Sequence, residues 1–166
     1  MAKRPVWLTE TQQQAWRSLL LMTQLLDEAL DRQLQADSGM AHSHYGILVA
    51  LSEAEDRSLR MSDLAAALRY SQSRLTHAVA RLERDGWVRR EPCPTDRRGL
   101  NAVLTDEGLH ALQAAAPGHV REVRARVFDA LSDKQVEQLH TICDALLDGL
   151  DGSGGARAIF ARPPAT

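Results

Sequence analysis

The spacing of apolar residues predicts that the N-terminal part of the chain is helical. A capping-box pattern formed by Thr9 and Gln12 precedes apolar residues that recur every three or four positions, which predicts a helix over about 10–35. A second helix is expected over 43–54, after a break at Ser38-Gly39. A third, short helix is expected to use Ser62 as its N-cap. Its narrow apolar stripe consists of Leu64, Ala65 and Leu68.

The next segment is the most clearly amphipathic part of the chain. A helix is predicted over about 71–85, starting at Ser71 or Ser73 and stopped by Gly86. Leu75, Val79 and Leu82 share one face of this helix. The opposite face carries Gln72, Arg74, Thr76, His77, Arg81 and Arg84. Two short helices joined by a tight turn, the second with a polar and cationic outer face, are typical of a helix-turn-helix.

A β-hairpin is predicted directly after this helix-turn-helix. Residues 87–91 and 100–105 alternate between apolar and polar, and residues 92–99 between them have the composition of a turn. Arg97 and Arg98 are expected at the hairpin tip, where guanidinium groups suit a narrow minor groove. The predicted fold class is therefore mainly α with a small β-hairpin wing: a winged helix-turn-helix spanning 42–105.

The C-terminal part is expected to form further helices. One begins at Thr105-Asp106-Glu107 and should be bent or broken by Pro117-Gly118. Beyond that pair, Val120, Val123, Val127 and Leu131 continue a helical stripe. A second capping box, at Ser132 and Gln135, opens a last helix with Val136, Leu139, Cys143, Leu146 and Leu150 on one face. These stripes have little other core to meet, so segments 9–38 and 106–150 are expected to form a dimerisation lobe, followed by a flexible tail at 151–166.

Charge separates the chain into two parts. Residues 57–98 hold ten arginines against five acidic residues, a local charge of about +5 in a chain of net charge −2. The remainder is therefore acidic, with about −7. A cationic segment within an acidic chain indicates a nucleic-acid partner, here double-stranded DNA. The expected DNA-binding residues are Ser71, Gln72, Ser73, Arg74, Thr76, His77, Arg81, Arg97 and Arg98, with Gln72 and Arg74 suited to base edges and the serines and Thr76 to phosphates.

Three segments resemble the MarR family of bacterial winged-helix regulators. The run from Asp96 to Thr105, followed by Asp106-Glu107-Gly108, is similar to the family's D-R-R-x-x-x-x-x-L-T signature with its trailing glycine. Residues 61–68 and 82–88 resemble the family's segments before the turn and at the end of the recognition helix. The resemblance covers about 9–150. It implies a homodimer on a pseudo-palindromic operator, and a minor-groove Arg98 held by an ion pair with Asp96. The Pro117-Gly118 pair departs from the uninterrupted helix of many members.

Several sensing roles remain open at this point. The family resemblance implies a small-molecule effector that binds between the two lobes. Trp16, Arg17, His44 and Tyr45 are the candidate residues to contact it, with Met22 and Leu112 nearby. A plain interhelical core explains these residues equally well. His42 and His44, with His110 or His140, suggest a metal-responsive regulator, although an H-x-H pair on a helix points its side chains apart. Cys93 suggests an oxidant-responsive one, and Cys143 is expected in the core or at a dimer face.

Other classes of protein fit the sequence less well. The chain lacks a Gly-rich phosphate loop and a G-x-S-x-G motif, so we expect neither an enzyme nor a cofactor. A winged helix used only for protein contacts would not need arginines at the hairpin tip. The two cysteines lie 50 residues apart, and no segment is apolar enough for a membrane span or a signal peptide, which favours the cytoplasm. The sequence therefore predicts a DNA-binding transcriptional regulator, most often a repressor in this family.

Overall fold

The computed structural model describes residues 7–94 and 96–150, without the side chains of Arg97 and Arg98. In chain order the elements are α1 (Glu10–Ser38), α2 (His42–Ser52), a 3-10 helix (Glu55–Arg57), β1 (Ser58–Arg60), α3 (Met61–Ala67), α4 (Gln72–Arg84), β2 (Val88–Cys93), β3 (Asp96–Leu104), α5 (Asp106–Arg126), a second 3-10 helix (Phe128–Ala130) and α6 (Asp133–Leu150). The predicted class, mainly helical with a small β wing, is confirmed. The tail at 151–166 lies outside the described residues.

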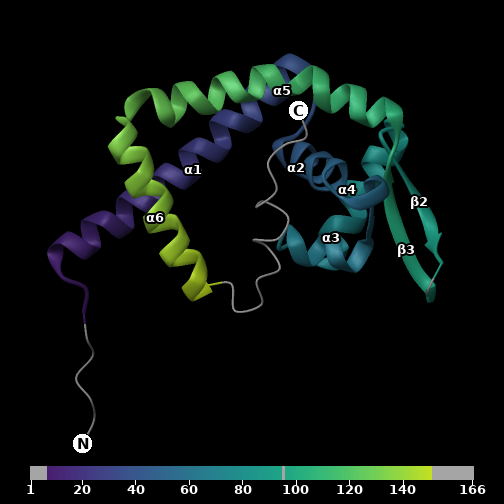
Figure 1. Cartoon of the computed structure of the whole chain (residues 1–166), viewed down its shortest axis with the longest axis horizontal. Coiled ribbons are helices and arrows are strands. Elements are labelled where there is room, and N and C mark those ends of the chain that lie inside the picture. Colours follow the sequence, from purple (N-terminus) through teal and green to yellow (C-terminus); the bar gives the residue numbers. More distant parts are fainter. Residues whose placement is uncertain (1–6, 95, 151–166) are drawn as a thin grey trace, which may run out of the picture.

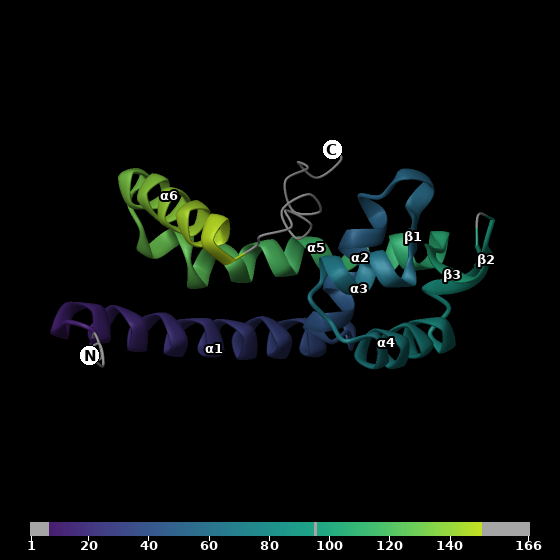
Figure 2. The same cartoon turned by 90° about the horizontal axis from the view of Figure 1, so that it is seen from below.

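The molecule has two parts that are linked by α1 and α5. Helices α2, α3 and α4 and the sheet form one part, while α6 and the N-terminal half of α1 extend to the other side (Figures 1 and 2). The main core lies in the first part and includes Ile47, Leu51, Leu64, Leu75 and Leu104. Leu112 of α5 packs against it, so α5 joins the winged part to the rest of the chain.

The sheet differs from the expected hairpin in two ways. Its order is β1-β3-β2 with antiparallel pairing, and the three-residue strand β1, which we did not expect, pairs with β3 from Ser58↔Val103 to Arg60↔Asn101. The expected turn over 92–99 is also wrong, because β2 continues to Cys93 and β3 already begins at Asp96. Pro92 is tolerated in β2 because this strand lies at an edge of the sheet.

The helix boundaries follow local capping signals at most positions. The capping box of α1 is confirmed: Thr9 N donates to Gln12 Oε1 (2.9 Å) and Gln12 N donates to Thr9 Oγ1 (3.2 Å). Helix α1 continues past 35 to Ser38 and ends at Gly39, whose φ of 66° is left-handed. The expected Ser62 cap is wrong, because α3 starts at Met61 and the Ser62 hydroxyl contacts the carboxylate of Asp63 instead.

Pro117-Gly118 does not break α5, which continues from Asp106 to Arg126. Gly118 faces α1: a Cβ atom there would lie 2.8 Å from Asp37 Oδ2 and 3.0 Å from Gln33 Nε2, so the glycine lets the two helices approach closely. The packing of α5 along α1 therefore outweighs the lost backbone donor of Pro117. The expected helical stripe to Leu131 is wrong beyond Arg126, where the chain turns through the second 3-10 helix into α6.

Candidate nucleic-acid interface

Helix α4 divides its side chains between the core and the surface. Ser71 is its N-cap, and its hydroxyl accepts a hydrogen bond from Arg74 N (3.2 Å). Leu75, Val79 and Leu82 are completely buried. All seven residues expected to contact DNA from this segment are exposed: Ser71, Gln72, Ser73, Arg74, Thr76, His77 and Arg81. The structure thus places them on one accessible side of the chain, anchored by a buried opposite face.

Local contacts orient two of these side chains. The guanidinium carbon of Arg74 lies 4.1 Å from the centroid of the Tyr70 ring, a cation–π distance. Thr76 Oγ1 donates to the backbone oxygen of Gln72 (2.7 Å), so the hydroxyl donor is used inside the helix and only its lone pairs face outward. A phosphate oxygen is itself an acceptor, so the expected phosphate contact of Thr76 requires this internal bond to break. The two contacts thus hold Arg74 against Tyr70 and occupy the hydroxyl donor of Thr76.

The wing is attached to α4 by a charged pair. Arg90 Nη2 lies 2.6 Å from Glu83 Oε2, and Arg90 N donates to Glu83 Oε1 (2.9 Å). Glu83 lies in the last turn of α4 and Arg90 in β2. The contact therefore fixes the base of the wing relative to the helix, and gives Arg90 a structural partner.

Asp96 has a partner that sequence reasoning missed. Its carboxylate forms an ion pair with the guanidinium of Arg60, at the end of β1. The family resemblance had directed attention to Arg98, whose side chain lies outside the described residues, so the Asp96–Arg98 pair stays a prediction. Arg60 belongs to the arginine-rich segment, but nothing in its local sequence indicates that β1 would lie beside the wing.

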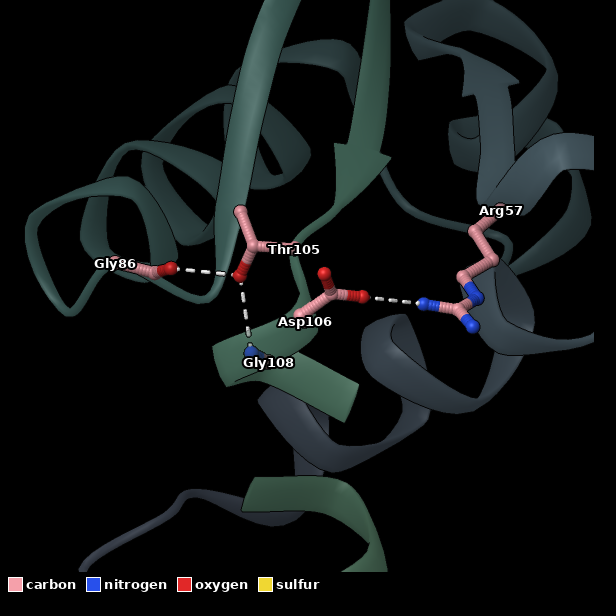
Figure 3. A network of polar contacts seen from close by, with 5 residues as sticks. All are labelled: Arg57, Gly86, Thr105, Asp106 and Gly108. Carbon is pink, nitrogen blue, oxygen red and sulfur yellow. Dashed lines mark hydrogen bonds and ion pairs between the residues drawn. The ribbon is translucent and has the colours of Figure 1, made fainter. Parts of the chain in front are cut away.

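The end of α4 and the start of α5 are connected by the network shown in Figure 3. The Thr105 hydroxyl donates to the backbone oxygen of Gly86 (2.7 Å) and accepts from Gly108 N (2.9 Å). A Cβ atom at Gly108 would lie 2.1 Å from the backbone oxygen of Trp87, so only glycine fits there. Arg57 Nη1 and Asp106 Oδ1, 2.9 Å apart, join the 3-10 helix that precedes β1 to the same helix end. The direction of α4 is therefore coupled to that of α5.

The four residues expected at an effector site lie in two regions of the single chain. Trp16 and Arg17 lie in the exposed N-terminal half of α1. Trp16 is about 16 Å along this helix from Asp27, the residue of α1 that contacts His42 of α2. Tyr45 instead contacts the ring of His119 on α5, with centroids 4.4 Å apart. His44 lines a small cavity of about 100 Å³ together with Arg81 of α4. Burial, and then the Arg81 charge, lower the pKa of His44.

The histidines considered for a metal site have separate surroundings. His42 Nδ1 lies 2.8 Å from Asp27 Oδ1, and the His42 ring centroid is 5.6 Å from that of His119. His140 lies instead on α6, 3.7 Å from Asp144, and His110 is exposed on α5. Across residues 7–94 and 96–150, no group of three or more His, Cys, Asp or Glu side chains is arranged to hold a metal ion.

The two cysteines also differ. Cys93 is buried at the end of β2, whereas Cys143 is exposed on α6. The expectation that Cys143 lies in the core of the chain is therefore wrong, and its alternative place at a dimer face stays a prediction. In the part of the chain that the structure describes, no helix is long and apolar enough to cross a bilayer.

Comparison with known proteins gives one consistent family. A sequence model of the MarR family matches residues 38–99. The transcriptional repressor MprA of Escherichia coli is 30% identical over 135 residues, which cover 81% of this chain and 76% of that protein. The crystal structure of Sco3205, a MarR family transcriptional regulator from Streptomyces coelicolor in complex with DNA, is 51% identical with a TM-score of 0.86, covering 92% of this chain and 95% of that one. AbsC from the same organism, also a MarR family regulator, is 43% identical with a TM-score of 0.83, covering 90% and 100%.

Proposed function

Because the chain belongs to the MarR family of transcriptional regulators, we propose that it binds a pseudo-palindromic DNA operator as a homodimer. The observation that carries this proposal is the exposed polar face of α4, which lies beside an arginine-bearing wing in an otherwise acidic chain. The similarity to Sco3205, whose structure contains DNA, supports it.

In the proposed complex, α4 enters the major groove and the β2–β3 wing follows the adjacent minor groove. Gln72 and Arg74 lie in the first turn of α4, and the N-terminal residues of such helices contact base edges. Amide and guanidinium groups bond bidentately to adenine and guanine. Ser71, Ser73, His77 and Arg81 are assigned to phosphates and neighbouring edges, and Thr76 joins them when its hydroxyl leaves the backbone oxygen of Gln72. Arg97 and Arg98 are assigned to the minor groove.

The dimer is supported by apolar surface that the single chain leaves exposed. Helix α6 contains no buried residue among the described positions, although Ile142, Leu146, Leu147 and Leu150 lie on it. The N-terminal half of α1 exposes Leu19, Leu20, Leu21 and Met22 as well. Contiguous apolar surface of this kind is typical of an interface. Segments 9–38 and 106–150 are therefore proposed to pair with a second copy, which leaves 42–105 free to bind DNA.

Repression is the proposed outcome of binding, since an occupied operator excludes RNA polymerase from an overlapping promoter. MprA, a relative of similar length, is named a transcriptional repressor. This role places the protein in the cytoplasm with its DNA target and requires no catalytic step.

A small-molecule effector is also proposed, because a cavity of about 550 Å³ between α1, α2 and α4 is lined by Asp27, His42, Tyr70 and Arg74. That volume lies within the usual range for ligand sites.

Binding of the purified protein to its own upstream DNA, in excess unrelated DNA and at two salt concentrations, tests the proposal. We expect protection of two half-sites centred about 10 base pairs apart. Arg74→Ala should weaken binding by about five- to 150-fold and relax specificity at one base pair per half-site. Arg98→Ala should lower both affinity and salt dependence. Binding that competitor DNA removes completely, or an Arg98→Ala variant with unchanged affinity, would favour a protein-interaction module instead.

A further inference from the structure

We propose that Arg60 is a positioning residue that holds the tip of the wing in the orientation in which its arginines meet DNA. The inference rests on the proposed function and adds to it a residue outside the wing. Arg60 ends β1 and is the N-cap of α3, so its backbone belongs to the rigid part of the winged domain. Its guanidinium reaches the wing and forms an ion pair with Asp96.

The backbone of the wing tip leaves the regular β-ladder at the two arginines that are assigned to the minor groove. Pairing between β2 and β3 jumps from Pro92↔Leu100 to Cys93↔Asp96, so β3 contains extra residues opposite one step of β2. Arg97, Arg98 and Gly99 are these extra residues. A bulge of this kind redirects side chains, and it also loses the ladder hydrogen bonds that would hold its backbone. The bulge therefore needs support from outside the two strands.

Arg60 contacts the chain on both sides of this bulge. Asp96, its ion-pair partner, directly precedes the two arginines, and Gly99 directly follows them. A Cβ atom at Gly99 would lie 3.0 Å from Arg60 Nη2 and 3.2 Å from Arg60 Nε. It would also lie 3.2 Å from Cys93 Cβ. The glycine thus leaves the space in which the guanidinium lies against the bulge.

The helices do not pack directly against the wing at this point, so they do not replace the contact made by Arg60. A cavity of about 320 Å³ is lined by Thr76 of α4 and Ser62 of α3 on one side and by Arg90 and Leu100 of the wing on the other. Arg60 lies along the same cavity, so its side chain bridges from the helices to the wing. A wing held in place before binding loses less conformational freedom when its arginines enter the minor groove.

The expected effect falls on DNA binding rather than on folding. The Arg60 and Asp96 side chains are 38% and 43% exposed. Ion pairs with this exposure contribute little to the stability of a fold. Variants of Arg60 should therefore unfold at nearly the wild-type denaturant concentration while their wings become more mobile.

A double-mutant cycle of Gly99→Ala and Arg60→Ala separates positioning from charge. Gly99→Ala changes no charge, but its methyl group displaces the guanidinium, and we expect operator affinity to fall about three- to tenfold. In the Arg60→Ala background the same substitution should cause only the smaller fall that comes from strain against Cys93, because the guanidinium is already gone. Strain between the new methyl group and Cys93 is present in both backgrounds, so it cancels from the coupling energy between the two substitutions. Gly46→Ala, at a helical glycine with nothing within 4 Å of its Cβ position, is the matched control and should bind normally.

Two further measurements complete the test. Arg60→Lys keeps the charge without the planar fork, so it should restore less than full affinity while matching the wild-type salt dependence. Amide hydrogen exchange over 96–101, measured without DNA, should be several-fold faster in Arg60→Ala and Gly99→Ala and unchanged elsewhere. Unchanged exchange, or additive affinity losses in the cycle, would overturn the role of Arg60. If the wild-type protein binds no operator, the proposed function itself is overturned. The hydrogen-exchange result would still decide whether Arg60 holds the wing.

Discussion

Helices α4 and α6 are both amphipathic, but the single chain buries the apolar face of only one of them. Leu75, Val79 and Leu82 of α4 are completely buried, while Ile142 of α6 is 57% exposed and Leu150 is 81% exposed. Helix α4 packs against α2, α3 and the sheet, whereas α6 lies apart from them (Figure 1). The winged part therefore completes its own core, and the other part leaves its apolar face exposed in the single chain.

Helix α1 shows the same difference along its own length. Ala29, Leu30 and Leu34 in its C-terminal half are buried against the rest of the chain. Leu20 and Leu21 in its N-terminal half are exposed. One continuous helix thus contributes to the core with its second half and exposes apolar residues with its first half.

The largest effect is expected from placing charges on the exposed apolar face of α6. Ile142→Asp combined with Leu146→Asp should convert the proposed dimer into a monomer, because two buried carboxylates cannot be desolvated without partners. Sedimentation should report half the mass, and operator affinity should fall by more than about 100-fold because the half-sites are then bound independently. Circular dichroism should show that the winged part stays folded.

A matched variant tests whether position or charge is responsible. Thr141→Asp combined with Ala145→Asp adds the same two charges to exposed positions of α6 that lie outside the stripe of Leu139, Leu146 and Leu150. This variant should remain dimeric and bind the operator normally. A monomeric control, or a dimeric Ile142→Asp/Leu146→Asp variant, would show that α6 is not the dimer face.

The next largest effect concerns the core of the winged part. Leu82→Ala should lower the free energy of unfolding by about 2–5 kcal/mol, because a completely buried leucine leaves a cavity. Leu150→Ala in the monomeric Ile142→Asp/Leu146→Asp background should change it by less than about 0.5 kcal/mol. Urea denaturation of both variants in that background measures the difference. Equal losses would mean that α6 packs within its own subunit.

Local signals explain which parts of this fold were predictable. The Thr9 cap, the Gly86 stop and the buried stripe of α4 depend on residues three or four positions apart, and the structure has them where the sequence places them. Strand β1 has only three residues and forms because β3 lies beside it. The continuation of α5 through Pro117 likewise depends on packing against α1. These two features are non-local, so no short pattern indicates them.

The candidate site follows the same rule. The exposed face of α4 could be predicted from helical periodicity alone, and every residue expected there is exposed. The partner of Asp96 could not, because Arg60 is 36 positions away in the sequence and meets it only through the pairing of β1 with β3. Sequence patterns thus identify which side chains face outward, whereas the contacts that orient them require the fold.

A smaller effect is expected at the junction between α4 and α5. Gly108→Ala should lower stability by about 1–3 kcal/mol, because its methyl group would overlap the backbone oxygen of Trp87. Thr105→Val removes the hydroxyl that contacts both Gly86 and Gly108, and should weaken operator binding by misdirecting α4. Thr105→Ser keeps the hydroxyl and should restore binding. If valine and serine bind the operator equally, this hydroxyl does not direct α4.

The smallest effect is a pH dependence that arises between the two parts. Burial, and then the nearby His42, lower the pKa of His119 below its ordinary value of 6.5; burial lowers that of His44 as well. The folded state therefore binds fewer protons than the unfolded chain, so this stability is fully present above pH 6.5 and is lost as the pH falls below it. Asp85 and Asp31 near His44 oppose the lowering of its pKa but do not reverse the direction. Thermal unfolding between about pH 5 and 7, above the range of ordinary carboxylates, should show a falling midpoint that His119→Gln makes less steep. An identical slope in His119→Gln would mean that His119 keeps the same pKa in both states, and that the contact between α5 and α2 does not respond to pH.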